Sequence, residues 1–568
     1  MKKEIKSITI LGGGVIGWFT AATMKKKHPE LSVELVESPY VPILGVGEST
    51  IPQLGDMLEW LDVDEKKWMQ GTHSIYKLGN MFGAWNTEKP MPRVQNHWDC
   101  DITEQQYYAF SYSWRDKAFK NSYYGSLKKD DFFYDNDGTF GIDHKSYDYW
   151  LELVRQGKYK WWETSDHVTE QYQLAINNKS PYDNNGDFLL GDWHSYAWHV
   201  DAERFPLIVR NQVAMPLGVK HTEGHVEHIH KDEDGYVTSL QLRDGRTIGG
   251  DLFLDCTGFN RIIMKTMEEK WNAMEHLPTQ SAWVCPIAYN DPKTEMRPYT
   301  QSYAQANGWN FIITLYSRMG SGYIFDKNSE DPDSARERFI RYWDGYKMLR
   351  DPKLIQWEQG YFDQAWAKNV CAIGMAQGFI DPMEANSIYI AQSGMEMLDK
   401  ALNKYKGGII SDFTKRAYSR QIQKLENQTA DFVSFHYTLS KRRDHPLWQK
   451  WGEYGLANDH IQKNWDWYKS PRSYLGRNIY LDYQWAQQHR YLDRWDDDIC
   501  KLNIDPDILP LAEIDFKYLK EKQTAVAKYA PNVYEYSKEH LYDGAEPHEI
   551  LEDAHQMTGV QHKYLKAS

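Results

Sequence analysis

The chain has 568 residues and carries 66 lysines and arginines against 80 aspartates and glutamates, a net charge of −14. Aromatic residues make up 14% of it, which excludes long disorder, and a pI near 5.8 counts against a nucleic-acid-binding protein. The five cysteines form no Cys-x-x-Cys pair, and no apolar stretch reaches the roughly 20 residues that span a bilayer, so the sequence predicts a reduced, cytoplasmic protein without a membrane anchor.

A dinucleotide-binding unit is predicted at the start of the chain. Residues 7–11 have the pattern of a buried strand, residues 18–27 of a helix, and residues 32–37 of a second strand. Between the first strand and the helix lies a Gly-x-Gly-x-x-Gly turn, whose glycines allow a tight turn, close approach of a pyrophosphate and packing of helix on strand. An acid ending the second strand can accept hydrogen bonds from ribose hydroxyls. The residues predicted to bind the cofactor here are Gly12, Gly14, Val15, Ile16, Gly17 and Glu37.

Residues 224–258 favour FAD over NAD as the dinucleotide. Two strand patterns, at 224–231 and 236–242, are followed by an Asp-Gly hairpin turn and a third short strand, which together predict a β-meander. The next strand ends in Asp-Cys-Thr-Gly, and this order resembles the second half of glutathione-reductase-type FAD domains. His228 and His230 share one face of the first meander strand. No carboxylate or cysteine stands at metal-ligand spacing beside them, so we expect a solvated face and no metal.

Three further segments resemble the flavin-dependent tryptophan halogenases. Residues 43–52, Ile-Leu-Gly-Val-Gly-Glu-Ser-Thr-Ile-Pro, resemble the Gly-x-Gly-Glu-x-Thr-x-Pro strap of that family. Residues 76–85, Tyr-Lys-Leu-Gly-Asn-Met-Phe-Gly-Ala-Trp, are similar to the segment that carries its active-site lysine. Residues 378–389, Gly-Phe-Ile-Asp-Pro-Met-Glu-Ala-Asn-Ser-Ile-Tyr, resemble its Glu-Pro-Leu-Glu-Ser-x-Gly-Ile stretch. With the FAD elements, the resemblance spans most of residues 1 to about 400.

The resemblance implies a halogenase acting on electron-rich aromatic carbon. In the family, reduced FAD and dioxygen oxidise a halide ion to hypohalous acid, which travels to a lysine beside the organic substrate. Lys77 matches this lysine, which can hydrogen-bond the hypohalous acid as an ammonium or form a haloamine as a neutral amine. Glu384 matches the nearby glutamate, which can polarise the electrophile or accept the ring proton. FADH₂ is expected from a separate flavin reductase, since the chain shows no second dinucleotide fingerprint.

The resemblance also implies residues for the halide, the flavin and the substrate chamber. Backbone N–H groups of Asn386 and Ser387 match those that hold the halide. The family usually has glycine at the second position, and glycine tolerates backbone angles that serine avoids. The strap implies a cover over the flavin formed by Pro42, Gly45 and residues 47–52. Further cofactor contacts are implied at Gly45, Val46, Gly47, Glu48, Ser49, Gly374 and Ile388, and chamber contacts at Pro52, Trp309 and Phe311.

One motif departs from the family pattern. Residues 309–314, Trp-Asn-Phe-Ile-Ile-Thr, stand where the family has Trp-x-Trp-x-Ile-Pro, although the Arg-x-Gly-x-Gly-Tyr continuation at 318–323 is kept. Phenol-type and indole-type substrates therefore both stay open. An FAD-dependent aromatic monooxygenase, which needs no relay lysine, and a non-catalytic FAD protein that binds an aromatic ligand are the alternatives. His199, in a His-x-Asp-Ala stretch that the family shares, is expected to be a packed structural histidine.

The predicted fold class is mixed α/β, with a glutathione-reductase-type FAD-binding Rossmann domain. The FAD module is predicted to cover residues 1–415 discontinuously, with aromatic-rich substrate-chamber insertions near 90–190 and 270–365. A mainly helical region, 416–568, is expected to cover that chamber, with Pro471, Pro506 and Pro510 breaking its helices into short pieces. The expected partners are a small aromatic substrate and the reductase, without nucleic acid or membrane, and a homo-oligomer is left open.

Overall fold

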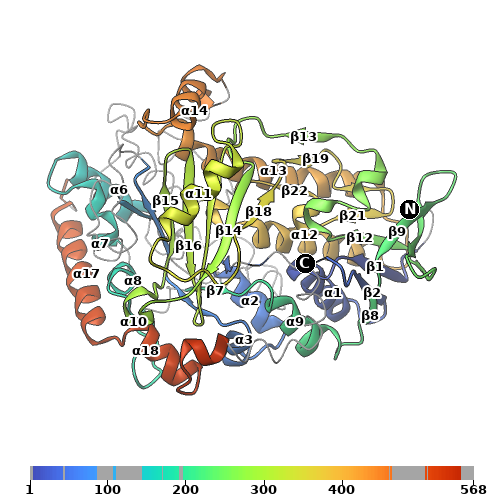
Figure 1. The fold of residues 1–568 in the computed structure, drawn as a ribbon, viewed down its shortest axis with the longest axis horizontal. Helices are drawn as coiled ribbons and strands as arrows, with labels where there is room; N and C mark the ends of the chain where they lie inside the picture. The colour runs from blue at the N-terminus through green and yellow to red at the C-terminus, as the bar shows by residue number, and fades with distance from the viewer. Residues whose placement is uncertain are drawn as a thin grey trace.

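The computed structural model describes residues 4–41, 45, 47–85, 106–109, 144–168, 171–190, 196–459, 461–463, 506–507 and 509–551. The architecture is mixed α/β, as predicted. A mainly parallel sheet lies at one end of the molecule and a larger, mainly antiparallel sheet lies near its centre, while helices α6 (His144–Arg155) and α17 (Leu509–Tyr529) pack together at the other end (Figure 1).

The sheet at the first end has the order β20-β21-β12-β1-β2-β8. Strand β1 (Ser7–Leu11) pairs in parallel with both β2 (Ser32–Glu37) and β12 (Leu252–Asp255), and β12 pairs in parallel with β21 (Val370–Ala372). These inner strands are rich in buried apolar residues, as expected where both faces of a parallel sheet are covered. The first two strands have the bounds predicted from the sequence.

Helix α1 (Val15–Lys27) packs against this sheet and against α12 (Ser387–Lys404). It begins at the fourth residue of the glycine turn, earlier than the predicted start at residue 18, because the last glycine of the motif already lies in the helix. The predicted meander is confirmed as strands β9 (Val226–Lys231), β10 (Val237–Leu242) and β11 (Thr247–Gly249). The two histidines singled out on the first of these strands are exposed, as expected.

The central sheet has the order β18-β14-β17-β16-β15-β5-β6. Most of its strands come from the predicted insertion at 270–365. The parallel pairing of β15 with β5 attaches the segment after Lys77 to them. In chain order the strands are β5 (Asn80–Gly83), β6 (Gln106–Ala109), β14 (Ser281–Ile287), β15 (Thr300–Ala304), β16 (Gly308–Thr314), β17 (Met319–Phe325) and β18 (Lys353–Gln356).

A small antiparallel sheet, β3-β7-β4, connects the two larger ones. Its strands are β3 (Glu48–Ser49), β4 (Ile75–Lys77) and β7 (Ala197–Val200). The register places Ser49 on one side of His199 and Ile75 on the other, and places Lys77 opposite Ala197. Residues far apart in the sequence are therefore neighbours here.

The region after residue 415 is mainly helical within the part that the structure describes. Helix α13 (Asp412–Thr438) has 27 residues and packs against α12 and α14 (Pro446–Ala457), so the predicted boundary at 415 falls inside a helix. The prediction that Pro510 breaks a helix is wrong: this proline lies in the first turn of the 21-residue α17, where proline is tolerated because its missing N–H would have no helical partner. None of the described helices is both long and apolar enough to cross a membrane.

The remaining elements fill the spaces between these units. They are α2 (Gln53–Trp60), α3 (Glu65–Gly71), α7 (Thr164–Val168), α8 (Tyr172–Ile176), α9 (Phe205–Val209), β8 (Lys220–Glu223), β13 (Trp271–Ala273), α10 (Pro292–Glu295), α11 (Pro332–Tyr342), β19 (Gly360–Phe362), β20 (Trp366–Ala367), β22 (Gly378–Phe379), α18 (Val533–Tyr536) and the short helices η2 (Trp161–Glu163), η3 (Arg210–Ala214), η4 (Gly258–Asn260), η5 (Met264–Met267), η6 (Gly374–Ala376), η7 (Pro382–Glu384) and η8 (Ser537–Leu541).

Candidate active site

The glycine turn before α1 has the shape that a pyrophosphate requires. Gly12 has a φ of +116°, and a Cβ there would lie 2.4 Å from the backbone oxygen of Cys256, so only glycine fits. A Cβ at Gly17 would lie 1.8 Å from the oxygen of Gly12. At Gly14, by contrast, a Cβ would meet no atom within 4 Å, and no described side chain caps the helix that starts there. The N–H groups of its first turn are therefore available to an anion.

Glu37 ends β2 beside this turn, as predicted. A Cβ on Gly13 would lie 1.6 Å from Oε2 of Glu37, so the carboxylate lies directly against the backbone of the turn. Oε1 lies 2.7 Å from Nε2 of His221 and 3.6 Å from Nη1 of Arg210. A carboxylate held in this position can still accept hydrogen bonds from a ribose.

The strap residues Pro42, Ile43, Leu44 and Val46 lie outside the described residues. Gly47 has a φ of +121°, which favours glycine. Gly45 lies so close to Glu203 that a Cβ would come within 2.2 Å of its Cγ. The side chain of Glu48 is accessible to solvent although its carboxyl lies deep in the protein, and burial raises its pKa to about 7. An accessible group at such depth lines a hollow, and this placement agrees with the predicted contact to the cofactor.

Lys77 is completely buried at the end of β4. Its Nζ donates hydrogen bonds to Oγ of Ser49 at 2.5 Å and to the backbone oxygen of Thr50 at 3.1 Å. Burial lowers the pKa of Lys77 to about 7, against the opposing effect of the negative charge of Glu384. The hydroxyl of Ser49, predicted to contact the cofactor, therefore binds the lysine.

Glu384 ends η7 and is buried beside a residue that the sequence analysis missed. Its Oε1 lies 3.7 Å from Nε2 of His436, a fully buried histidine on α13. Among the described residues, neither Oε1 of Glu384 nor either ring nitrogen of His436 has a hydrogen-bond partner. The imidazole stacks on Phe82, with 4.7 Å between ring centroids. No motif marked this histidine, because it lies inside a long helical pattern with aromatic neighbours.

The two residues predicted to bind the halide lie at the start of α12. Asn386 precedes the helix and Ser387 is its first residue, in right-handed helical backbone. The left-handed conformation that favours glycine occurs instead at Ala385, with a φ of +55°. Serine at position 387 therefore needs no unusual backbone angle, and the replacement of glycine does not prevent its N–H from facing an anion.

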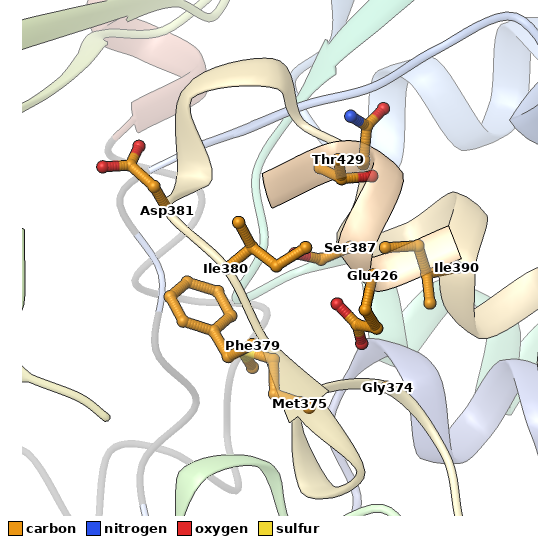
Figure 2. A pocket seen from close by; sticks show the side chains of 11 residues that line it. Gly374, Met375, Phe379, Ile380, Asp381, Ser387, Ile390, Glu426 and Thr429 are labelled. Carbon is orange, nitrogen blue, oxygen red and sulfur yellow. The ribbon is translucent and has the colours of Figure 1, made fainter. Parts of the chain in front are cut away.

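Both residues line a small pocket, together with Gly374, Met375, Gly378, Phe379, Ile380, Asp381, Ile390, Glu426 and Thr429. The space open to the centre of a water-sized molecule is about 10 Å³, enough for one such molecule. Figure 2 shows Glu426 between the segment that carries Phe379 and the helix that carries Ser387 and Ile390.

Glu426 of α13 is a further buried acid that the sequence analysis did not single out. Its Oε1 accepts a hydrogen bond from Nε2 of Gln377 at 3.3 Å, and Oε2 has no partner in the described part of the chain. Burial raises the pKa of this carboxyl to about 8. At neutral pH the pocket therefore has a protonated acid on its wall.

The predicted chamber residues occupy different surroundings. Trp309 is buried, and its Nε1 donates to the hydroxyl of Tyr437 at 2.7 Å, which in turn donates to Asp381 at 2.6 Å. Phe311 is partly buried and lies against Gly322, where a Cβ would approach its ring to 2.5 Å. The indole N–H of Trp309 thus holds the fold together and is not directed at a ligand.

Three other predicted contacts lie where strands and helices meet. Pro52 is buried and precedes α2. Gly374 has a φ of +68°, and a Cβ there would lie 3.2 Å from the side chain of Ile16 at the start of α1. Ile388 is buried in the first turn of α12. The last two therefore lie at the helix starts that the cofactor and halide predictions involve.

The glycine turn, the uncapped start of α1, the acid ending β2 and the deep, accessible carboxyl on β3 together fit an FAD with its pyrophosphate on α1. Comparison with known proteins identifies the family. The family model described as tryptophan halogenase matches residues 7–488. The chain belongs to the tryptophan halogenase family.

Individual relatives agree with this assignment. Over 468 residues the chain is 29% identical to the tryptophan 6-halogenase ThaL of Streptomyces albogriseolus, which covers 81% of each chain. Over 480 residues it is 28% identical to the tryptophan 7-halogenase RebH of Lentzea aerocolonigenes, covering 83% of each. In fold it resembles a tryptophan halogenase from Shewanella frigidimarina, with a TM-score of 0.78, 22% identity, and coverage of 96% of this chain and 99% of that one.

Membership confirms the predicted resemblance, fold class, enzyme class and cofactor. This halogenase is an oxidoreductase whose family uses FADH₂, O₂ and halide. Members act on aromatic substrates and receive reduced flavin from a separate reductase. The roles of individual residues are a matter for the proposals below.

Proposed function

We propose that this halogenase transfers an oxidised halogen to an electron-rich carbon of a phenol-type or indole-type ring, with Lys77 as the relay and Glu384 beside it. The observation that most supports this is the state of Lys77. Its Nζ is buried, is hydrogen-bonded within a small sheet, and has a pKa of about 7 in the field of Glu384. An exposed lysine has a pKa near 10.4 and offers almost no neutral amine at neutral pH.

A pKa near 7 keeps both forms of Lys77 populated at neutral pH. As an ammonium, the side chain donates a hydrogen bond to the oxygen of hypohalous acid and makes the halogen more electrophilic. As an amine, it attacks the halogen, so that an N–X bond forms and water leaves. Both routes deliver the halogen from the same atom, and both belong to the proposal.

Glu384 is proposed to accept the proton that the ring carbon loses when its C–X bond replaces its C–H bond. Its Oε1 is buried and accepts no hydrogen bond from any described residue, so this oxygen is available as an acceptor. The negative charge also favours the ammonium form of Lys77. Glu384 thus acts on both the lysine and the substrate.

FAD, when bound, supplies the chemistry that turns dioxygen and halide into the oxidant. The protein is proposed to hold its pyrophosphate at the start of α1 and its ribose at Glu37, with Glu48 lining the cofactor space. The halide is proposed to lie at the backbone N–H groups of Asn386 and Ser387, which line a pocket of suitable size. These assignments rest on the placement of the residues described above.

The test is turnover with reduced FAD, dioxygen and each of chloride, bromide and iodide, using a panel of phenols and indoles analysed by mass spectrometry. We expect a halogenated product that Lys77→Ala and Lys77→Met abolish while both variants still bind FAD, as followed by flavin absorbance. The loss in Glu384→Gln should be equal or smaller, since proton removal is only part of the reaction.

A matched control is Lys415→Met, which removes a buried lysine far from these residues in the sequence, on α13. This variant should keep its activity. Hydroxylated products without halogen would favour the monooxygenase alternative. Halogenation that survives in both Lys77 variants would exclude the proposed relay while leaving the family assignment intact.

A further inference from the structure

A chain of hydrogen bonds connects Lys77 to His199. Nζ of Lys77 donates to Oγ of Ser49 at 2.5 Å, and this hydroxyl lies 2.8 Å from Oγ1 of Thr300. Oγ1 of Thr300 lies 2.8 Å from Nε2 of His199, whose Nδ1 lies 2.9 Å from the backbone oxygen of Thr314. All of these groups are buried, and they come from β4, β3, β15, β7 and β16.

The far end of the chain fixes the direction of every bond in it. A backbone carbonyl can only accept, so Nδ1 of His199 must carry a hydrogen. Burial, together with the charge of Lys77, lowers the pKa of His199 to about 3, so the ring is neutral and Nε2 has a lone pair. Nε2 must then accept from the hydroxyl of Thr300.

This direction continues to the lysine. Because the hydroxyl hydrogen of Thr300 is used toward His199, its oxygen accepts from Ser49. The hydroxyl hydrogen of Ser49 is then used toward Thr300, so its oxygen faces Lys77 as an acceptor. Every member of the chain has its hydrogen-bonding role determined by the next, as in a fully satisfied buried network.

We propose that His199 is a positioning residue that acts through Thr300 and Ser49 to keep the serine an acceptor toward Lys77. The inference deepens the proposed function and rests on the role of Lys77 in it. A serine free to rotate would donate its hydrogen to the nitrogen lone pair, which would block attack on a halogen and disfavour the ammonium. The chain prevents both effects.

The neighbours of Lys77 show why a neutral device is useful here. Glu384 is the ionisable group whose negative charge acts on Lys77. Glu48 precedes Ser49 on the same strand, and His199 is neutral. The hydroxyl chain favours the N–H-rich state without placing a second carboxylate beside the lysine.

The test compares Thr300→Val, which keeps the side-chain shape but removes the hydroxyl, with Thr300→Ser, which keeps it. In FAD-loaded enzyme supplied with reduced flavin, we expect Thr300→Val to lower kcat about tenfold with KM within about twofold, and to lower the apparent pKa of kcat that Lys77 governs by about one unit. Thr300→Ser should stay within about threefold of the wild type. An unchanged kcat and pH profile in Thr300→Val would overturn the proposal.

Thr72→Val is the matched control for lost stability, because it also removes a buried hydroxyl that donates to a backbone oxygen, Trp68 O at 2.7 Å, but has no link to Lys77. It should leave the pH profile unchanged. Equal losses in Thr300→Val, Thr300→Ser and Thr72→Val would show a packing effect and overturn the proposal.

Nitrogen-15 NMR of histidine-labelled wild-type protein tests the direction of the chain without turnover. The signals that disappear in His199→Gln should be those of a neutral, Nδ1–H imidazole that does not titrate between pH 5 and pH 8, written here as roughly the range where ordinary histidines titrate. An Nε2–H tautomer or titration in that range would overturn the proposal. Because this measurement does not involve Lys77 chemistry, it separates failure of the chain from failure of the relay function.

Discussion

Two buried cations near opposite ends of β7 are held in different ways. Arg318, in the turn between β16 and β17, lies 2.9 Å from the carboxylate of Asp201, which directly follows β7, and both side chains are buried. Lys77 lies opposite the first residue of β7 and donates to a hydroxyl and a backbone oxygen. Both cations have been removed from water, but only the arginine has a carboxylate in direct contact among the partners described here.

The effect on ionisation differs accordingly. Burial lowers the pKa of Lys77 to about 7. For Asp201, burial raises the pKa, but the charges of Arg318 and His73 outweigh it and the net shift is downward. A close ion pair keeps its charges fixed over the physiological range, whereas a buried lysine bonded to neutral oxygens can change its charge. The first arrangement suits a structural joint and the second suits a reacting group.

Removing the cation should therefore have opposite consequences at the two sites, and the largest effect is expected at Arg318. Arg318→Met leaves the carboxylate of Asp201 buried without its partner, which costs about 3 to 5 kcal/mol of unfolding free energy. Urea-induced unfolding near pH 7 measures the loss. The double variant with Asp201→Asn should recover part of it, because the amide needs no counter-charge. A loss under about 1 kcal/mol in the single variant would contradict the structural role.

At Lys77 the same kind of substitution should stabilise the fold. Folding lowers its pKa from the usual 10.5 to about 7, so between these values the unfolded chain binds more protons and wild-type stability rises with pH. Lys77→Met lacks this dependence. We expect the variant to be about 2 kcal/mol more stable at pH 7, after allowance for two lost hydrogen bonds, with the difference shrinking toward pH 10. Unfolding curves across this range would refute the shifted pKa if both proteins gave parallel profiles.

The two cations also show which features the sequence could predict. The glycine turn, β1, β2 and the acid ending β2 were predicted because they are contiguous, and local pattern determines their form. The Lys77 site is assembled from five strands separated by up to hundreds of residues. The family resemblance indicated Lys77 and Glu384, but Thr300 belongs to no recognised motif.

Residues inside recognised segments could still be assigned the wrong partner. Ser49 lies in the strap segment, yet its hydroxyl binds Lys77. The His-x-Asp-Ala and Arg-x-Gly-x-Gly-Tyr segments could not be connected from the sequence, and they meet in the ion pair between Asp201 and Arg318. His436 has no sequence signal at all. Partner choice depends on strand register and helix packing, which periodicity alone does not determine.

A buried acid extends the comparison with the opposite sign. The pKa of Glu426 is raised from the usual 4.5 to about 8 by burial, so between these values the folded protein holds a proton that the unfolded chain has lost. Wild-type stability therefore falls as the pH rises through this window. Glu426→Gln keeps the shape and can still accept from Gln377. We expect the variant to be about 1 kcal/mol more stable near pH 8 and equal to the wild type near pH 4.5, measured by urea unfolding. A variant that lost stability across the whole range would contradict a neutral Glu426.

The smallest effect is expected where a buried lysine has a solvent-exposed partner. Lys415 is buried on α13 and lies 2.8 Å from Asp412, whose side chain is 75% exposed. The hydrogen bond from Lys415, more than its charge, lowers the pKa of Asp412. Because water screens this pair, Lys415→Met should cost only about 0.5 kcal/mol near pH 7. The depressed pKa of the aspartate means that the pair's contribution disappears as the pH falls through that value. Urea unfolding at neutral and acidic pH would show this loss, and a cost as large as that of Arg318→Met would mean that burial of the cation alone, without burial of its partner, determines the strength of such a pair.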